Sequence, residues 1–257
     1  MVLERIQAML TSCATDSPLF PPTLLYNESW LLRLVLDGFS TSLVGDHPLR
    51  VPEGGRWFSE ALLPSAFLTR WKGDALAEAW THADAVMGHF EVGLEGKTDL
   101  QLADGATHFV VLEAKLFSGL SSGVKYAAYF DQAARSVACI AEVLNRARRS
   151  PQSMSHLGFY VLAPRSQIEK GVFAELLSRD SIRQKVNRRV AAYEGAKAEW
   201  YSDWFEPTLQ RVDIRSMSWE QVIGVVRQNG GACADSIGAF YERCIEFNHQ
   251  VPTGVLA

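Results

Sequence analysis

The hydrophobic and polar positions of this chain change between helical and strand spacing along its length. After Asn27, which is suited to cap a helix, apolar residues recur at helical spacing and predict a helix over about 28–38. From His82 onward the pattern becomes that of β-strands, in HADAVMGHFEVGL, KTDLQLA and HFVVLEAKL. An amphipathic helix, VKYAAYFDQAARSVACIAEVLNRARR, and a further strand, HLGFYVLAP, follow. This order predicts a mixed α/β domain with a central sheet.

The remaining segments carry weaker patterns. WFSEALLPSAFLTRW, residues 57–71, looks like a short helix interrupted near Pro64. The C-terminal third is mostly helical, with SWEQVIGVVRQ and ADSIGAFYERCIEFNHQ as its clearest segments. With 257 residues and 47% apolar content the chain is able to bury a substantial core. We expect one domain over 1–257, with a core over about 26–164 and a helical extension over about 165–257.

Net charge and composition limit which cellular environment and which binding partners we expect. A net charge of −4 gives no overall basic character, so a nucleic-acid surface would have to be a local patch. RARR at 146–149 and RQKVNRRV at 183–190 are candidates for such a patch, although charge runs are more often solvated helix surface. There is no long apolar run or signal-like segment, so we expect a cytoplasmic protein without membrane contact. The pattern does not define an oligomeric state.

Charged residues interrupt two of the predicted strands. Asp104-Gly105 is a turn signal between KTDLQLA and HFVVLEAKL, which together read as a β-hairpin. A three-residue loop at 104–106 would place Asp99, Glu113 and Lys115 on one face and the apolar residues on the other. In that register the two acids are diagonal neighbours, with Cβ atoms on the order of 7 Å apart.

Two acids so close repel each other, and a divalent cation removes the conflict. Carboxylate ligands with positions left for water suit Mg²⁺ or Mn²⁺. Lys115 would lie beside Asp99 and Glu113, where it could activate a metal-bound water or hold it in line for attack. It could also stabilise the negative charge that develops on a phosphate under attack. The three residues therefore indicate hydrolysis of a phosphodiester.

At these residues the sequence resembles a known family. Asp99 followed by Glu113-Ala114-Lys115, at the end of an apolar strand, is similar to the signature of the PD-(D/E)XK nuclease superfamily. The resemblance covers about residues 26–164. The first predicted helix, with Glu28, is similar to the family's leading helix, which often supplies an acid. The RecB-like branch is one candidate, although the chain lacks the tight cysteine spacing of that branch's iron–sulfur cluster.

The resemblance implies a three-layer, restriction-endonuclease-like fold with a central mixed sheet flanked by helices, and Mg²⁺- or Mn²⁺-dependent cleavage of DNA or, less often, RNA. It also implies roles for single residues. The metal ligands would be Asp99, Glu113, the Ala114 carbonyl and, through water, Glu28, whereas Lys115 would be the catalytic lysine. Gln132 and Arg135, on the helix after the lysine strand, are similar to family residues that face the metal or the phosphate.

Each of these residues also has a structural explanation. Glutamate followed two residues later by lysine can be a solvated edge pair, and a glutamate such as Glu28 is favoured in any first helical turn. Gln132 can simply be an exposed helix residue. Asp84, His82 and His89 could reach a metal from their strand, but a structural hydrogen bond is the commoner use of such residues. The alternative function is a non-catalytic nucleic-acid or protein binding module that keeps the nuclease fold.

Overall fold

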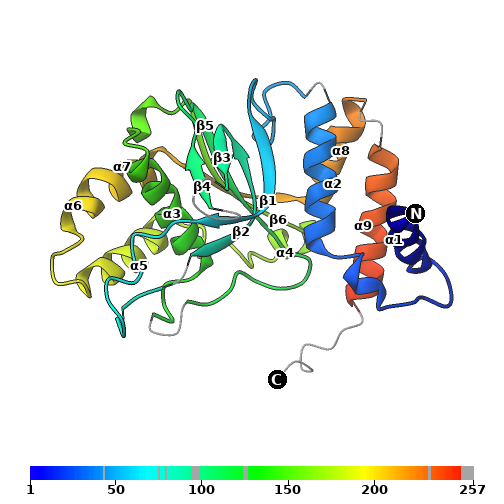
Figure 1. The fold of residues 1–257 in the computed structure, drawn as a ribbon, viewed down its shortest axis with the longest axis horizontal. Coiled ribbons are helices and arrows are strands. Elements are labelled where there is room, and N and C mark those ends of the chain that lie inside the picture. The colour runs from blue at the N-terminus through cyan, green and yellow to red at the C-terminus, as the bar shows by residue number, and fades with distance from the viewer. Residues whose placement is uncertain are drawn as a thin grey trace.

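A five-stranded sheet forms the centre of the computed structural model, with helices packed on both of its faces (Figure 1). The structure describes residues 1–42, 44–74, 76–78, 80–93, 99–123, 127–230 and 233–249. The strand order is β1-β2-β5-β6-β7, antiparallel from β1 to β5 and parallel from β5 to β7. The sheet is therefore mixed, and the fold is α/β with helical layers on either side, as the sequence predicts.

Along the chain, strands β1 to β5 follow one another, and helices separate the later strands. The strands are β1 (Arg56–Leu63), β2 (Thr81–Gly88), β3 (Phe90–Val92), β4 (Leu100–Leu102), β5 (His108–Ala114), β6 (His156–Ala163) and β7 (Asp213–Ser218). The helices are α1 (Val2–Ser12), α2 (Glu28–Thr41), α3 (Gln132–Arg146), α4 (Arg165–Glu169), α5 (Arg179–Ala191), α6 (Ala198–Trp200), α7 (Glu206–Arg211), α8 (Trp219–Gln228) and α9 (Ala234–His249). Two 3₁₀ turns, Pro22–Leu24 and Pro151–Ser153, and a π-helical turn, Tyr201–Phe205, complete the described structure.

The two faces of the sheet bury separate apolar clusters. Phe109 and Val111 of β5 point into a cluster with α3, α5 and α7, whereas Val110 and Leu112 point into a cluster with α2, α8 and α9. Figure 1 shows these helix groups on opposite sides of the sheet. Because side chains of a strand alternate between faces, Glu113 points to the same side as Val111, toward α3.

The predicted helices on both sides of the strands are present. Helix α2 begins after Asn27, whose side chain accepts a hydrogen bond from the Trp30 amide. Helix α3 begins at Gln132, later than its apolar pattern predicts, because the Asp131 side chain caps it there. No helix within the described residues has the length and hydropathy needed to cross a bilayer.

Two predictions about elements need correction. Residues 56–63 form strand β1 rather than a short helix, because pairing with β2 at every residue except Glu60 overrides the helical spacing of their apolar residues. The C-terminal part is mostly helical, as expected, but it is more than an extension. Its strand β7 pairs with β6 in the central sheet, and α8 and α9 cover one face of that sheet.

The predicted hairpin between residues 97 and 115 is also wrong where the structure describes it, from residue 99 onward. The turn at Asp104-Gly105 exists, since the Ala106 amide donates to the Ala103 carbonyl and Gly105 has a φ of 71°. The segments on its two sides, however, do not pair with each other. Strand β4 pairs with β3 in a separate two-stranded sheet, and β5 pairs with β2 and β6. The turn therefore redirects the chain from one sheet into another.

Candidate active site

The carboxyl groups of Asp84 and Glu113 meet at one end of the central sheet. The register of β2 and β5, with Ala85 opposite Leu112, places Asp84 opposite Glu113. Their carboxyl groups are within hydrogen-bonding reach of each other. The two strands diverge at this point, and the Ala114 amide donates to Asp84 Oδ2 at 2.7 Å instead of to the backbone of β2. Glu113 is fully buried, so this is a contact between two acids in a largely dry place.

Lys115 completes the cluster. Its Nζ lies 3.7 Å from Asp84 Oδ2 and 3.6 Å from Glu113 Oε2. The backbone of Lys115 is held on both sides, because its amide donates to the Leu162 carbonyl and its carbonyl accepts from Trp219 Nε1. The direction of the lysine side chain therefore follows from the sheet and from α8, and one ammonium group faces both acids.

Helix α3 contributes polar groups from the opposite side. Gln132 Nε2 donates to Glu113 Oε2 at 2.5 Å, and Ser136 Oγ lies 3.5 Å from Glu113 Oε1. The orientation of the Gln132 amide is fixed because its oxygen accepts from the Ser121 amide. Both oxygens of the buried carboxyl group thus have a partner on the first turns of α3. The sequence prediction that Gln132 faces the site agrees with this geometry.

Without a further cation, the two carboxyl groups of this cluster repel each other. Burial raises the pKa of Glu113 well above its ordinary value, and the neighbouring Asp84 raises it further. Lys115 and Gln132 act in the other direction but do not compensate. A proton or a cation between the two carboxyl groups would relieve the repulsion, so this is a place where a divalent ion would fit.

Asp99 lies elsewhere in the fold. Its backbone forms a bridge with Leu62 of β1, the edge strand, which β2 separates from β5. The Asp99 side chain is buried and lines a cavity of about 370 Å³ together with Trp80 and Arg146. The predicted meeting of Asp99 with Glu113 therefore fails, because it depended on the hairpin that does not form.

Glu28 is likewise not brought to the cluster. It lies in the first turn of α2, on the face of the sheet opposite α3. Its charge acts on Cys244 of α9, where burial and, second, the Glu28 charge raise the pKa of the thiol to about 12. Ala114 is buried between Glu113 and Lys115, as expected, and its amide rather than its carbonyl has a defined role in holding Asp84.

The structure thus puts Asp84 where the sequence led us to expect Asp99. Asp84 is a single acid in an apolar strand, on the same face as Val86, which was a usable signal. A structural hydrogen bond is the commoner use of such a residue, and Asp84 does accept one from the Ala114 amide. His89 has such a role only, because its two ring nitrogens contact the Glu53 carbonyl and the Thr107 amide.

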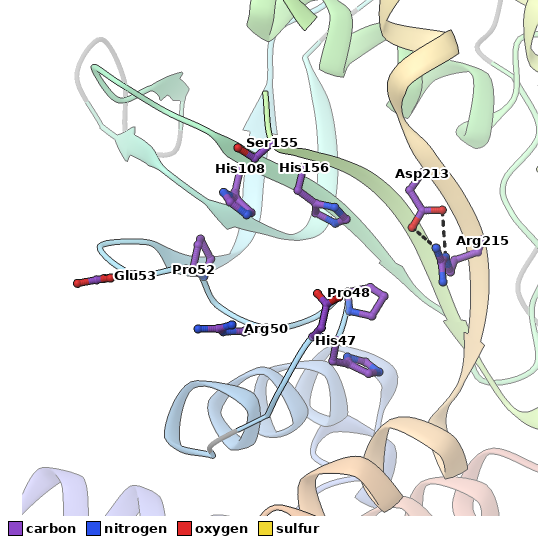
Figure 2. Close-up of a pocket in the computed structure, with 11 residues that line it drawn as sticks. His47, Pro48, Arg50, Pro52, Glu53, His108, Ser155, His156, Asp213 and Arg215 are labelled. Atoms are coloured by element: carbon purple, nitrogen blue, oxygen red, sulfur yellow. Dashed lines mark hydrogen bonds and ion pairs between the residues drawn. The ribbon is translucent and has the colours of Figure 1, made fainter. Parts of the chain in front are cut away.

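A separate polar cavity of about 720 Å³ lies at the other end of the sheet (Figure 2). His108 and His156, at the starts of β5 and β6, extend from the sheet toward the loop that carries Arg50. Burial lowers the pKa of both histidines, which favours their neutral forms. The cavity is lined by Asp46, His47, Pro48, Arg50, Pro52, Glu53, His108, Ser155, His156, Asp213 and Arg215.

This cavity lacks the features of the acid and lysine cluster. Its Asp213 is neutralised by Arg215, at 2.5 Å, and accepts a hydrogen bond from the Tyr160 hydroxyl. His108 and Glu113 lie five residues apart on β5, which corresponds to roughly 17 Å along a strand. The unresolved charge repulsion lies at the Glu113 end, and we place the candidate active site there.

The candidate active site therefore consists of Asp84, Glu113, Lys115 and Gln132. Two carboxylates that share one buried position can hold a hard cation, and an ammonium group beside them can contact a bound anion. Such an arrangement is suited to chemistry on a phosphate group. Searches against protein-family models, curated proteins and solved structures found no match to this chain.

Proposed function

We propose that this chain is a Mg²⁺- or Mn²⁺-dependent nuclease with a restriction-endonuclease-like core, which hydrolyses phosphodiester bonds in nucleic acid. The observation that carries the proposal is the contact of the buried Glu113 carboxyl group with Asp84, beside the Lys115 ammonium group. DNA is favoured over RNA by the sequence resemblance alone. The order of a leading helix, strands with acids and lysine, and a following helix with glutamine supports the same class.

The residues present fit a magnesium-like ion. Such ions are typically held by one or two carboxylates, and water and substrate phosphate oxygens fill the other positions. Asp84 and Glu113 would supply these carboxylates, with the Ala114 carbonyl as a further candidate ligand. Among the described residues no group of three or more His, Cys, Asp or Glu side chains could hold a metal. Two acids would leave the other coordination positions open for water and substrate.

The side chains have separate parts in this proposal. The ion, when bound, supplies Lewis-acid polarisation of the phosphate and neutralises charge on it. Lys115, within 4 Å of both carboxylates, is placed to donate a hydrogen bond to a phosphate oxygen or to orient the attacking water. Gln132 positions Glu113, and the Ala114 amide positions Asp84. These fixed partners keep the acids in place before substrate arrives.

The alternative is a binding module that keeps this fold without turnover. A decayed active site usually lacks one of the charged groups, whereas here two acids, the lysine and the glutamine all converge. Buried like charges weaken a fold, and such a cost is usually retained where function requires it. Their presence therefore favours catalysis over binding alone.

A cleavage assay with Lys115→Ala separates these two functions. We expect the unaltered protein to degrade linear, circular or single-stranded DNA when Mn²⁺ is present and not in EDTA. Lys115→Ala should lower the rate by about 10²- to 10³-fold, because a charge-stabilising donor is lost. Lys170→Ala, which removes an exposed lysine after α4, serves as the matched control and should cleave normally. Equal cleavage by Lys115→Ala would indicate a contaminant, and no cleavage with any metal would favour the binding module.

A further inference from the structure

Helix α5 packs against α3 (Figure 1). Lys185 Nζ of α5 lies 2.6 Å from Asp131 Oδ2. The other oxygen of Asp131 caps α3 by accepting from the Ala134 amide. The next residue, Gln132, donates to Glu113. A short chain of contacts therefore fixes α5 relative to the acids.

One turn beyond Lys185, the guanidinium group of Arg188 lies over an aromatic ring. The Arg188 Cζ is 3.9 Å from the centroid of the Tyr129 ring. Tyr129 itself packs against the apolar cluster under α3, so the ring is a fixed support. Tyr129 precedes Gln132 by three positions, and this stretch of chain spans at most about 10 Å. The stacked pair consequently lies near the start of α3, the end of that helix from which Gln132 reaches Glu113.

Arg188 also has no carboxylate partner among the residues that the structure describes. Within the part of the chain that the structure describes, eight other arginines form ion pairs with Asp or Glu, and Arg188 forms none. Its side chain is exposed. A guanidinium group stacked on a ring keeps its N–H donors at its own edge, in the guanidinium plane, and leaves its outer face open. It can therefore bind a phosphate at its edge and stack a base on its outer face.

The depth of the acids limits which nucleic acids can reach them. The exposed fractions of the side chains are 27% for Asp84, 12% for Lys115 and 0% for Glu113. A duplex is stiff and holds its phosphates on a fixed path, since its persistence length is about 50 nm. A single strand can bend its backbone into a recess and turn its bases outward to stack. Recessed acids beside an open stacking surface suit a single strand.

We infer that Arg188, supported by Tyr129, binds the nucleotide next to the scissile phosphate of a single-stranded nucleic acid. This inference rests on the proposed nuclease function, because it takes the scissile phosphate to lie at Asp84, Glu113 and Lys115. It adds the substrate class and a binding residue on α5. The basic run of residues 183–190 then has a specific role at Arg188, whereas Arg183 and Lys185 of the same run are held in ion pairs.

Binding measurements in a non-cleaving background test the inference. A fluorescein-labelled single-stranded 12-mer DNA is titrated with Lys115→Ala protein in Mg²⁺ and followed by fluorescence anisotropy, with the annealed duplex in parallel. We expect the single strand to bind at least about tenfold more tightly than the duplex. Adding Arg188→Ala should weaken single-strand binding about tenfold and reduce the slope of log K against log salt by about 0.7, the value for one phosphate contact. Arg188→Lys, which keeps the charge and loses the stack, should fall between the two.

Arg243→Ala is the matched control. Arg243 is an arginine of α9 that stacks on Phe247 at 4.4 Å, on the other side of the sheet, and its removal should leave binding unchanged. Equal binding by the Arg188→Ala and Arg243→Ala proteins would overturn the role of Arg188, and equal binding of duplex and single strand would overturn the substrate class. Cleavage by the unaltered protein is scored separately. If single-strand binding depends on Arg188 but no nucleic acid is cleaved, the nuclease proposal fails while the binding contact stands.

Discussion

Asp84→Asn is expected to lower metal-dependent cleavage by at least about 10²-fold, whereas Asp99→Asn should cleave within about twofold of the unaltered protein. The new amide side chain could still accept the hydrogen bond from the Ala114 amide, but the change would remove one of the two charges that meet at Glu113. Loss of a charged group at a metal and phosphate site removes several kcal/mol of transition-state stabilisation. The rate then falls roughly 10²- to 10³-fold. Initial rates over a range of Mn²⁺ concentrations measure both variants.

The Asp99 variant is the control for this experiment, because both changes are nearly isosteric and both aspartates lie in or beside strands. Asp99 is the more buried of the two, so circular dichroism and thermal unfolding must show that its variant is folded. Loss of cleavage with Asp99→Asn together with full cleavage by Asp84→Asn would contradict the site and restore the residue that the sequence motif indicates.

Glu113→Gln should make the metal-free protein more stable while it removes the response to metal. The Glu113 carboxyl group is buried against Asp84, and both causes raise its pKa. A raised pKa means that stability is present below the ordinary value of about 4.5 and is lost as pH rises through the raised pKa. Glutamine carries no charge and can still accept the hydrogen bond from Gln132. At pH 8 we expect a gain of about 1–2 kcal/mol, or several degrees in Tm.

Thermal unfolding in EDTA at pH 5 and pH 8 checks this, with the larger gain for Glu113→Gln expected at pH 8. Mn²⁺ at a concentration of 100 Kd should raise the free energy of unfolding of the unaltered protein by about 2.7 kcal/mol, seen as a higher Tm. The Tm of Glu113→Gln should be nearly unchanged. Glu142→Gln is the matched control: Glu142 is a buried glutamate of α3 with its own partner, Arg146, and its loss should not stabilise the protein. If Glu113→Gln has a lower Tm than the unaltered protein at pH 8, the surroundings of the Glu113 carboxyl group compensate its charge well, and this prediction is wrong.

The sequence predicts the fold class because several helices and strands are specified by residues within them. Asn27 caps α2, and the buried apolar positions of β5 and β6 mark central strands. The strand β1 is different. Its apolar residues fit a helical spacing, and only the neighbouring strand β2, brought in by tertiary pairing, makes it a strand. The strand β7 belongs to the sheet for a similar reason, since its partner β6 lies about fifty residues earlier.

The site shows the same limit more sharply. Glu113, Lys115 and Gln132 could be predicted because their positions depend on one strand and the helix after it. The identity of the second acid depends on which strand pairs with β5. From the turn at Asp104-Gly105 the sequence predicts that the segment after Gly96 pairs with β5. In the structure β3 and β4 pair with each other, and β2 pairs with β5. The register of two strands separated by an inserted hairpin is not contained in the spacing of their residues.

The most direct test of the site is the position of a bound ion. Crystals soaked in Mn²⁺ would be measured at an X-ray wavelength where manganese scatters anomalously, which locates the ion without reference to the protein. The account predicts one anomalous peak within about 2.5 Å of carboxylate oxygens of both Asp84 and Glu113, and its absence in Glu113→Gln crystals. An ion bound at Asp99, or at the cavity of Figure 2, with none between Asp84 and Glu113, would contradict it.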